Sequence, residues 1–203
     1  AMKNAFVETE NYRRFQAALK HLEKRGAEEA RLIVVDGDPG LGKTTILDRW
    51  ATQTGCIYIR AVKQWTPIWF LQELLNAFRI PAPSSFKKGF AEAITALNQR
   101  RTACALAKRP FAVVIDEADH ISRSTEIVET IRDFADIAEV PFVLVGMGKI
   151  RANLTRFPQV SSRISKPVRF ERASLQDVRA LIDGLCEVPV ADDLVAFTWS
   201  ASD

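Results

Sequence analysis

The sequence has few cysteines, and none of them forms a CxxC pair. Cys56, Cys104 and Cys186 lie far apart in the chain of 203 residues, which argues against a zinc site or a disulfide framework. We interpret each of them as a small apolar residue of a core. Because disulfides are not expected, the chain suits a reducing environment, and we expect a cytoplasmic protein.

Long apolar runs are also missing. Apolar stretches such as residues 111–115 are too short to span a bilayer, and the N-terminus lacks the apolar segment of a secretory signal. We therefore expect no membrane partner. Hydrophobic residues still make up 47% of the chain and charged residues 26%, which excludes general disorder and is typical of a globular domain with a real core.

Acidic residues are scarce in one part of the chain. The net charge is only +3, but residues 61–110 carry 8 basic and 2 acidic side chains, whereas residues 111–203 carry 10 basic and 15 acidic ones. A local excess of positive charge in a nearly neutral chain indicates a local anionic partner.

The apolar pattern alternates between strand and helix five times. Short, continuously apolar runs predict buried strands at 31–36, 56–59, 111–115, 141–145 and 168–170. Apolar residues at helical spacing predict helices at 11–24, 45–51, 67–78, 90–106, after Ser124, at 149–157 and from Ser174 onward. Strands of this kind form a parallel sheet with both faces covered, so we expect a three-layer α/β fold with a five-stranded parallel sheet.

The strongest motif fits G-x-x-x-x-G-K-[ST] at every position, between a predicted strand and a predicted helix. Its glycines let the backbone N–H groups face phosphates, and the helix N-terminus adds positive potential. Lys43 is expected to reach the β- and γ-phosphates, and the Thr44 hydroxyl to ligate Mg²⁺. A glycine-rich turn without a ligand is disfavoured by this context. The expected nucleotide-binding residues are Gly37, Asp38, Pro39, Gly40, Leu41, Gly42, Lys43, Thr44 and Thr45.

The second motif is an apolar strand that ends in two carboxylates, Asp116 and Glu117, as in a Walker B motif. We expect Asp116 to hold the water shell of the Mg²⁺ ion and Glu117 to orient and polarise the attacking water. Residues 116–119 also spell the tetrapeptide of DEAD-box helicases, but the chain is too short for their second motor domain. We therefore interpret Asp119 and His120 as loop residues that could contact a neighbouring subunit.

The order of these motifs resembles that of the AAA+ ATPases, from about Asn11 to the end of the chain. The segment 145–148 (VGMG) is similar to the transposition-regulator branch, which contains the phage Mu B protein, TnsC and TniB. This resemblance implies ATP and Mg²⁺ as cofactors, a homo-oligomer in the form of a ring or filament, double-stranded DNA as a ligand and a transposase as a partner. ExeA-like and origin-recognition ATPases have similar cores and remain alternatives.

The resemblance also implies an arginine finger just before the fifth strand. Arg163 matches this position best, and Arg156 is the alternative. The finger would reach the γ-phosphate bound by the next subunit and complete a catalytic set with Glu117 and Lys43. An ion pair within the chain is the other interpretation of either arginine.

Two features of the family are not found in their usual places. The polar sensor 1 residue that usually ends the fourth strand is replaced by Gly146, so we expect slow hydrolysis. The lid arginine of the family is not reached before Asp203. We divide the chain into an N-terminal segment (1–10, with Ala1 as a tag remnant), a nucleotide-binding core (11–173) and the start of a truncated helical lid (174–203).

The basic middle segment is the candidate DNA surface. Lysines that contact phosphates bind DNA without specificity for its base sequence. We favour a DNA contact for Lys63, Lys87 and Lys88. A solvated helix face is the preferred interpretation of the remaining basic residues, which are Arg100, Arg101, Lys108 and Arg109. Trp65 and Trp69 are expected to pack in the core.

Together these features predict an ATP-dependent, oligomerising AAA+ ATPase that binds DNA nonspecifically and regulates transposition. A nucleotide-gated scaffold that recruits a protein partner, with little hydrolysis or DNA binding, is the alternative from another functional class. Glu117 favours the enzyme, whereas Gly146 favours the scaffold.

Overall fold

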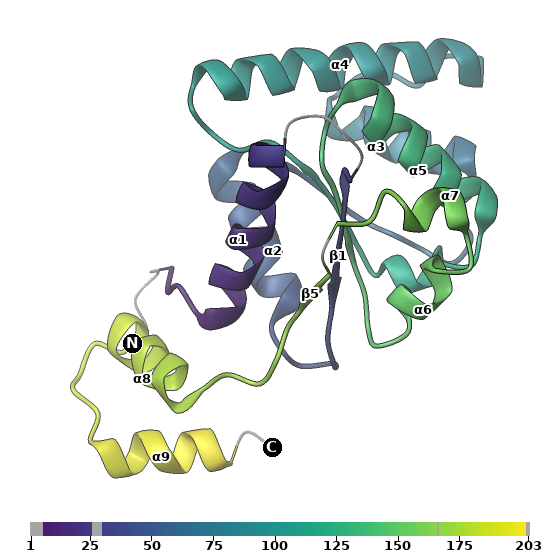
Figure 1. Cartoon of the computed structure of the whole chain (residues 1–203). Coiled ribbons are helices and arrows are strands. Elements are labelled where there is room, and N and C mark those ends of the chain that lie inside the picture. The colour runs from purple at the N-terminus through teal and green to yellow at the C-terminus, as the bar shows by residue number, and fades with distance from the viewer. Residues whose placement is uncertain (1–5, 26–29, 166, 202–203) are drawn as a thin grey trace.

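Figure 1 shows the computed structural model of the chain, which describes residues 6–25, 30–165 and 167–201. Its five strands are β1 (Leu32–Asp36), β2 (Ile57–Arg60), β3 (Val113–Asp116), β4 (Phe142–Val145) and β5 (Val168–Arg169). They form one sheet in the order β2-β3-β4-β1-β5, and every neighbouring pair is parallel. The predicted five-stranded parallel sheet is confirmed.

Helices connect the strands and cover both faces of the sheet (Figure 1). They are α1 (Glu10–Arg25), α2 (Lys43–Thr54), α3 (Pro67–Ala77), α4 (Phe86–Leu106), the 3₁₀ turn η1 (Ala118–His120), α5 (Thr125–Ala138), α6 (Ile150–Leu154), α7 (Pro158–Ser161), α8 (Leu175–Leu185) and α9 (Asp192–Ser200). Because the strands are parallel, all of their carboxyl ends meet at one edge, where ligands bind in folds of this type.

The alternation of side chains along each strand divides the core into two layers. On β1, Leu32 and Val34 pack with α3 to α7, whereas Ile33 and Val35 pack with α1 and α2. All four are fully buried, which explains why this strand is continuously apolar rather than alternating. Burying such a side chain contributes roughly 1.5–3 kcal/mol, so the two layers hold the strand ends in place.

The region after β4 differs from its prediction. A single helix at 149–157 was expected, but the structure has two short helices, α6 and α7, because Pro158 starts a new one. Phe157 takes an extended conformation (φ −109°, ψ 95°), as residues before proline usually do. The helix after Ser174 is confirmed, and it starts with a capping box between Ser174 and Asp177.

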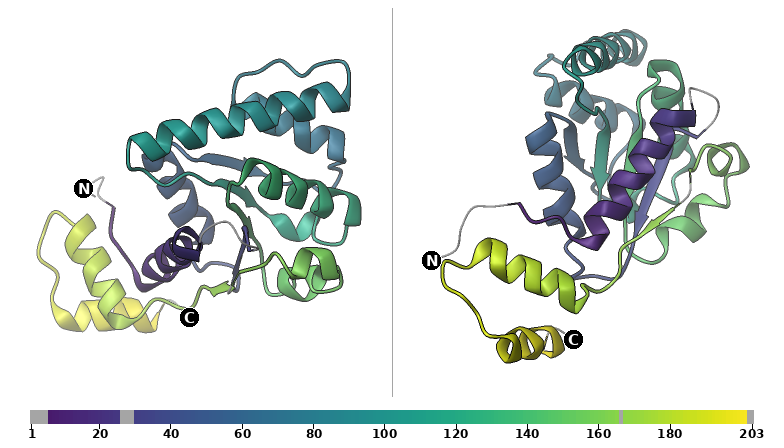
Figure 2. Two further views of the ribbon diagram at one scale, coloured as in Figure 1. Left: turned by 45° about the horizontal axis from the view of Figure 1, so that its top comes forward. Right: turned by 60° about the vertical axis from the view of Figure 1, so that its left-hand side comes forward.

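The helices α8 and α9 stand apart from the sheet (Figures 1 and 2). The chain before α1 lies against α8, where the Glu10 N–H donates to Asp177 Oδ1 at 2.9 Å. Asn11 fixes the segment before α8 through two hydrogen bonds with the backbone of Glu171. The two terminal parts of the chain are thus tied to each other. Within the described residues, no helix has both the length and the apolar character needed to cross a membrane.

Candidate functional site

The glycine-rich loop lies between β1 and α2, at the carboxyl edge of the sheet. Gly40 and Gly42 adopt left-handed backbone angles (φ +83° and +75°), which other residues rarely adopt. Gly42 is the N-cap of α2, and its side-chain-free backbone leaves the first amides of the helix accessible. Loop amides and a helix N-terminus at one place form a site for phosphate groups.

Lys43 lies at the centre of this loop. Its side chain is buried, and Nζ donates to the carbonyl oxygens of Gly37 and Asp38, both at 2.6 Å. Burial lowers the pKa of Lys43, while the charges of nearby carboxylates, first of all Asp36 and Asp116, oppose this shift. The ammonium group of Lys43 therefore already lies within the phosphate loop, as the motif predicts.

The two motifs meet through Thr44 and Asp116. The Thr44 hydroxyl donates to Asp116 Oδ2 at 2.7 Å, although the residues are 72 positions apart in the chain. Asp116 is buried at the end of β3 and also accepts a hydrogen bond from Tyr58 Oη at 2.5 Å. Burial and the Asp116 carboxylate together raise the pKa of Tyr58 well above its usual range. A hydroxyl and a carboxylate oxygen side by side are donors that suit Mg²⁺.

Glu117 follows Asp116 in a strained position. Its backbone is left-handed (φ 54°, ψ 32°), which is uncommon for residues other than glycine and typical of functional sites. The carboxylate forms an ion pair with Arg60 at the end of β2, and this pair lowers the pKa of Glu117. His120 Nε2 lies 3.6 Å from the other carboxylate oxygen. Glu117 is therefore an ionised carboxylate held on the β2 side of Asp116.

These groups fit a Mg²⁺–nucleotide complex. The loop amides, the α2 N-terminus and Lys43 match phosphate oxygens, while Thr44 and Asp116 match the metal. Bound Mg²⁺ would neutralise charge that develops on the phosphates. Glu117 lies next to this set and can accept a proton from a water molecule.

Comparison with known proteins agrees with this geometry. The profile of the family described as "AAA domain" matches residues 25–154. The chain belongs to the AAA domain family. A search of curated proteins found no match.

Solved structures share the fold of this AAA domain. The ORC2 protein of Aeropyrum pernix (ADPNP–ADP complexes) has a TM-score of 0.64 and 15% identity over 94% of this chain and 57% of its own. Cdc6p of Pyrobaculum aerophilum has a TM-score of 0.64 and 18% identity over 97% of this chain and 56% of its own. The Aeropyrum pernix ORC1 protein in complex with DNA has a TM-score of 0.63 and 17% identity, with coverages of 97% and 55%. The chain thus spans little more than half the length of these proteins.

Two residues beside the expected site were missed from the sequence. Tyr58 and Arg60 lie on β2 and reach Asp116 and Glu117, respectively. Asp119 lies in η1, in the connection after β3 where a loop residue was expected, and its carboxylate accepts a hydrogen bond from the Met147 N–H after β4. A contact between Asp119 and a neighbouring subunit stays a prediction. Tyr58 and Arg60 could have been found from the sequence, because both are polar residues on the strand next to the Walker B strand. No comparable pattern marks Asp119.

Arg163 lies far from the phosphate loop of its own chain. Its carbonyl oxygen accepts a hydrogen bond from the N–H of Leu32, the first residue of β1, whereas the loop follows the other end of β1. Its Nε lies 3.1 Å from Asp136 Oδ2 of α5. Arg156 is exposed and makes no ion pair with any residue that the structure describes. The arginine finger stays a prediction. Arg163 lies too far from the phosphate loop of its own chain to contact a nucleotide bound there.

The three predicted DNA lysines share one end of the α3–α4 pair. Lys63 lies in the loop between β2 and α3, and Lys87 and Lys88 lie in the first turn of α4. A Cβ added to Gly89 would lie 3.0 Å from Leu71 Cδ2, so the start of α4 lies against the start of α3. All three lysines are exposed. Their role in DNA binding stays a prediction.

The two tryptophans after β2 differ. Trp65 is buried, as expected. The prediction for Trp69 was wrong, because its side chain is 39% exposed and its Nε1 donates to Glu73 Oε1 at 2.9 Å. Trp69 belongs to the same end of α3 as Lys63, so this surface combines positive charge with an aromatic ring.

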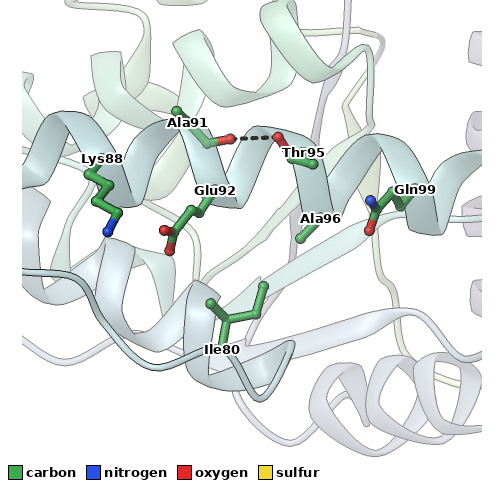
Figure 3. Close-up of a pocket in the computed structure, with 7 residues that line it drawn as sticks. All are labelled: Ile80, Lys88, Ala91, Glu92, Thr95, Ala96 and Gln99. Carbon is green, nitrogen blue, oxygen red and sulfur yellow. Dashed lines mark hydrogen bonds between the residues drawn. The ribbon is translucent and has the colours of Figure 1, made fainter.

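A hollow of about 340 Å³ lies along α4 (Figure 3). It is lined by Ile80, Lys88, Ala91, Glu92, Thr95, Ala96 and Gln99. Thr95 uses its hydroxyl within the helix, where it donates to the Ala91 carbonyl at 2.9 Å. None of the phosphate-loop or Walker B residues lines this hollow, so it is separate from the nucleotide site.

Proposed function

We propose that this AAA domain binds ATP with Mg²⁺ and hydrolyses it. The observation that carries the proposal is the Thr44–Asp116 hydrogen bond, which joins the two motifs beside the buried Lys43. In this scheme Lys43 and the loop amides bind the phosphates, and Thr44 and Asp116 hold the metal. Glu117 accepts the proton of the attacking water.

The role of Glu117 is tested by the substitution Glu117→Gln. The amide keeps the size of the side chain but cannot accept a proton, so turnover should fall at least about 100-fold while ATP affinity stays within about threefold. Single-turnover hydrolysis and equilibrium binding of ATP measure the two effects. Turnover at the parent rate would show that Glu117 is not the base.

We further propose that the domain acts as an ATP-dependent oligomer on double-stranded DNA. The exposed lysines at the start of α3 and α4 and the fold shared with an ORC1 protein solved with DNA support DNA binding. An arginine that acts on the next subunit, Arg163 or Arg156, would couple assembly to hydrolysis.

Three biological roles compete. The structural similarity to ORC and Cdc6 proteins supports an origin-recognition-like role better than the regulation of transposition through a transposase. A nucleotide-gated scaffold without DNA binding is the other candidate, and Gly146 favours it because a side chain that positions water is lacking there. Filter binding to duplex DNA with and without ATP separates the scaffold from the two DNA-binding roles, since only the scaffold predicts no retention in either condition.

A further inference from the structure

The end of the central strand β4 lies between the two motifs of the nucleotide site. β4 has β1 and β3 as its neighbours, and the N–H of Gly146 donates to the Val35 carbonyl of β1 at 3.0 Å. Position 146 therefore lies between the phosphate loop, which follows β1, and the carboxylates that end β3. A side chain at this position would adjoin both motifs.

Glycine is the residue that fits at position 146. A Cβ there would approach Asp119 Oδ2 to 2.6 Å and Ile150 Cβ to 2.8 Å. Both distances are shorter than the van der Waals radii of the atoms allow, so a side chain at 146 would require Asp119 or Ile150 to move. The carboxylate of Asp119 thus occupies the space that a side chain at 146 would need.

Asp119 is held in this place from two sides. Its Oδ2 accepts the hydrogen bond from the Met147 N–H, in the loop between β4 and α6. Its carbonyl oxygen accepts a hydrogen bond from Ser122 Oγ at 3.0 Å, and Asn153 Nδ2 of α6 donates to that hydroxyl at 2.9 Å. Ser122 and Asn153 are buried, and a buried network whose members are bonded fixes the local geometry.

The Asp119 carboxylate interacts electrostatically with Lys43 of the phosphate loop. Burial raises the pKa of Asp119, and the neighbouring charge of Asp36 acts in the same direction. In turn, the Asp119 carboxylate is one of the charges that oppose the lowering of the Lys43 pKa. Asp119 therefore belongs to the electrostatic surroundings of the phosphate loop.

We propose that Asp119 supplies the polar group at the end of β4 that residue 146 cannot supply, and that it is a positioning residue for ATP hydrolysis. This inference rests on the proposed ATPase function. The carboxylate packs against Gly146 and fixes the β4–α6 loop through Met147, which sets the spacing between the phosphate loop and the Asp116–Glu117 pair. Because Lys43 and the loop amides bind phosphates without it, Asp119 acts on turnover rather than on affinity.

The substitutions Asp119→Ala and Asp119→Asn test this role, with Asp133→Ala on the surface of α5 as the matched control. We expect kcat to fall roughly ten- to a hundredfold in Asp119→Ala, since small misplacements of reacting groups cost that much. KM and the affinity for a fluorescent ATP analogue should stay within about threefold. Asp119→Asn should recover kcat to within about threefold, because its amide oxygen still accepts the Met147 N–H.

A second measurement follows the loop without nucleotide. In Asp119→Ala, hydrogen exchange of the Met147 amide should become at least about tenfold faster, with no change in Asp133→Ala. The inference alone is overturned if kcat of Asp119→Ala stays within twofold of the parent, if kcat and affinity fall together, or if exchange at Met147 is unchanged. A parent protein that does not hydrolyse ATP contradicts both the proposed function and this inference.

Discussion

The ion pair between Arg60 and Glu117 determines where the expected base lies. Arg60 ends β2, which is separated from β1 and its phosphate loop by both β3 and β4. The pair therefore draws the Glu117 carboxylate away from the place where phosphate binds. Arg60 is 68% exposed, so the pair contributes little free energy and can open at small cost.

The substitution Arg60→Ala should release Glu117 and raise basal turnover. An exposed pair contributes little, so we expect an increase of roughly two- to fivefold in kcat and no change in ATP affinity. Arg100→Ala, on the exposed face of α4, is the control for loss of one positive charge. Steady-state hydrolysis measures the effect, and a fall in kcat would mean that Arg60 orients Glu117 for catalysis instead.

At the scale of elements, the starts of α3 and α4 form a surface that combines charge with apolar side chains. Lys63, Lys87 and Lys88 are exposed there, together with Trp69 and Phe86, each 39% exposed. The other end of α4 lies about 30 Å away, because a helix of 21 residues rises 1.5 Å per residue. Basic residues toward the far end of α4 can therefore serve as controls for substitutions at this surface.

Charge reversal of the three lysines should weaken duplex binding about equally for all sequences, because phosphate contacts carry no base information. The salt dependence should also flatten, with a change in slope of roughly one for each lysine that no longer binds a phosphate. Arg100→Glu with Lys108→Glu, at the far end of α4, should leave both quantities unchanged. DNA titrations at several salt concentrations measure both the affinity and the salt slope. Equal effects of the lysine variant and the Arg100/Lys108 variant would assign DNA binding to general positive charge rather than to this surface.

Part of the molecule could be predicted from the sequence because the signal is local. The strands are continuous apolar runs buried on both faces, and the phosphate loop carries its chemistry within eight residues, so both were found. The contact of Asp119 with Gly146 could not be predicted, because Gly146 is 27 positions away and becomes adjacent only after β3 and β4 pair. Trp69 was misplaced because apolar spacing on α3 does not reveal which face α4 leaves uncovered.

At the scale of the whole molecule, the predicted arginine finger would make hydrolysis depend on assembly. Arg163 lies at the amino-terminal end of β1, whereas its own phosphate loop follows the carboxyl end, and Arg163 forms an ion pair with Asp136. If Arg163 is the finger, it acts on another subunit rather than on its own phosphate loop.

Arg163→Ala should spare ATP binding and lower the turnover of oligomers at least about tenfold. Asp136→Ala removes the same ion pair but keeps the arginine, so it should retain turnover. Mixing Arg163→Ala with Glu117→Gln subunits should recover part of the activity if the arginine acts in trans. If no mixing ratio restores activity, the same experiment with Arg156→Ala shows whether that exposed arginine is the finger.

The central claim is that the loop between β1 and α2 binds the phosphates of ATP through Lys43, and equilibrium binding of ATP with Mg²⁺ tests it most directly. Lys43→Ala removes a buried cation from the loop, so the dissociation constant should rise at least about 100-fold, the equivalent of roughly one charge-assisted hydrogen bond to a phosphate. Lys20→Ala, an exposed lysine on α1, should bind ATP as the parent does. Undiminished affinity in Lys43→Ala would contradict the account.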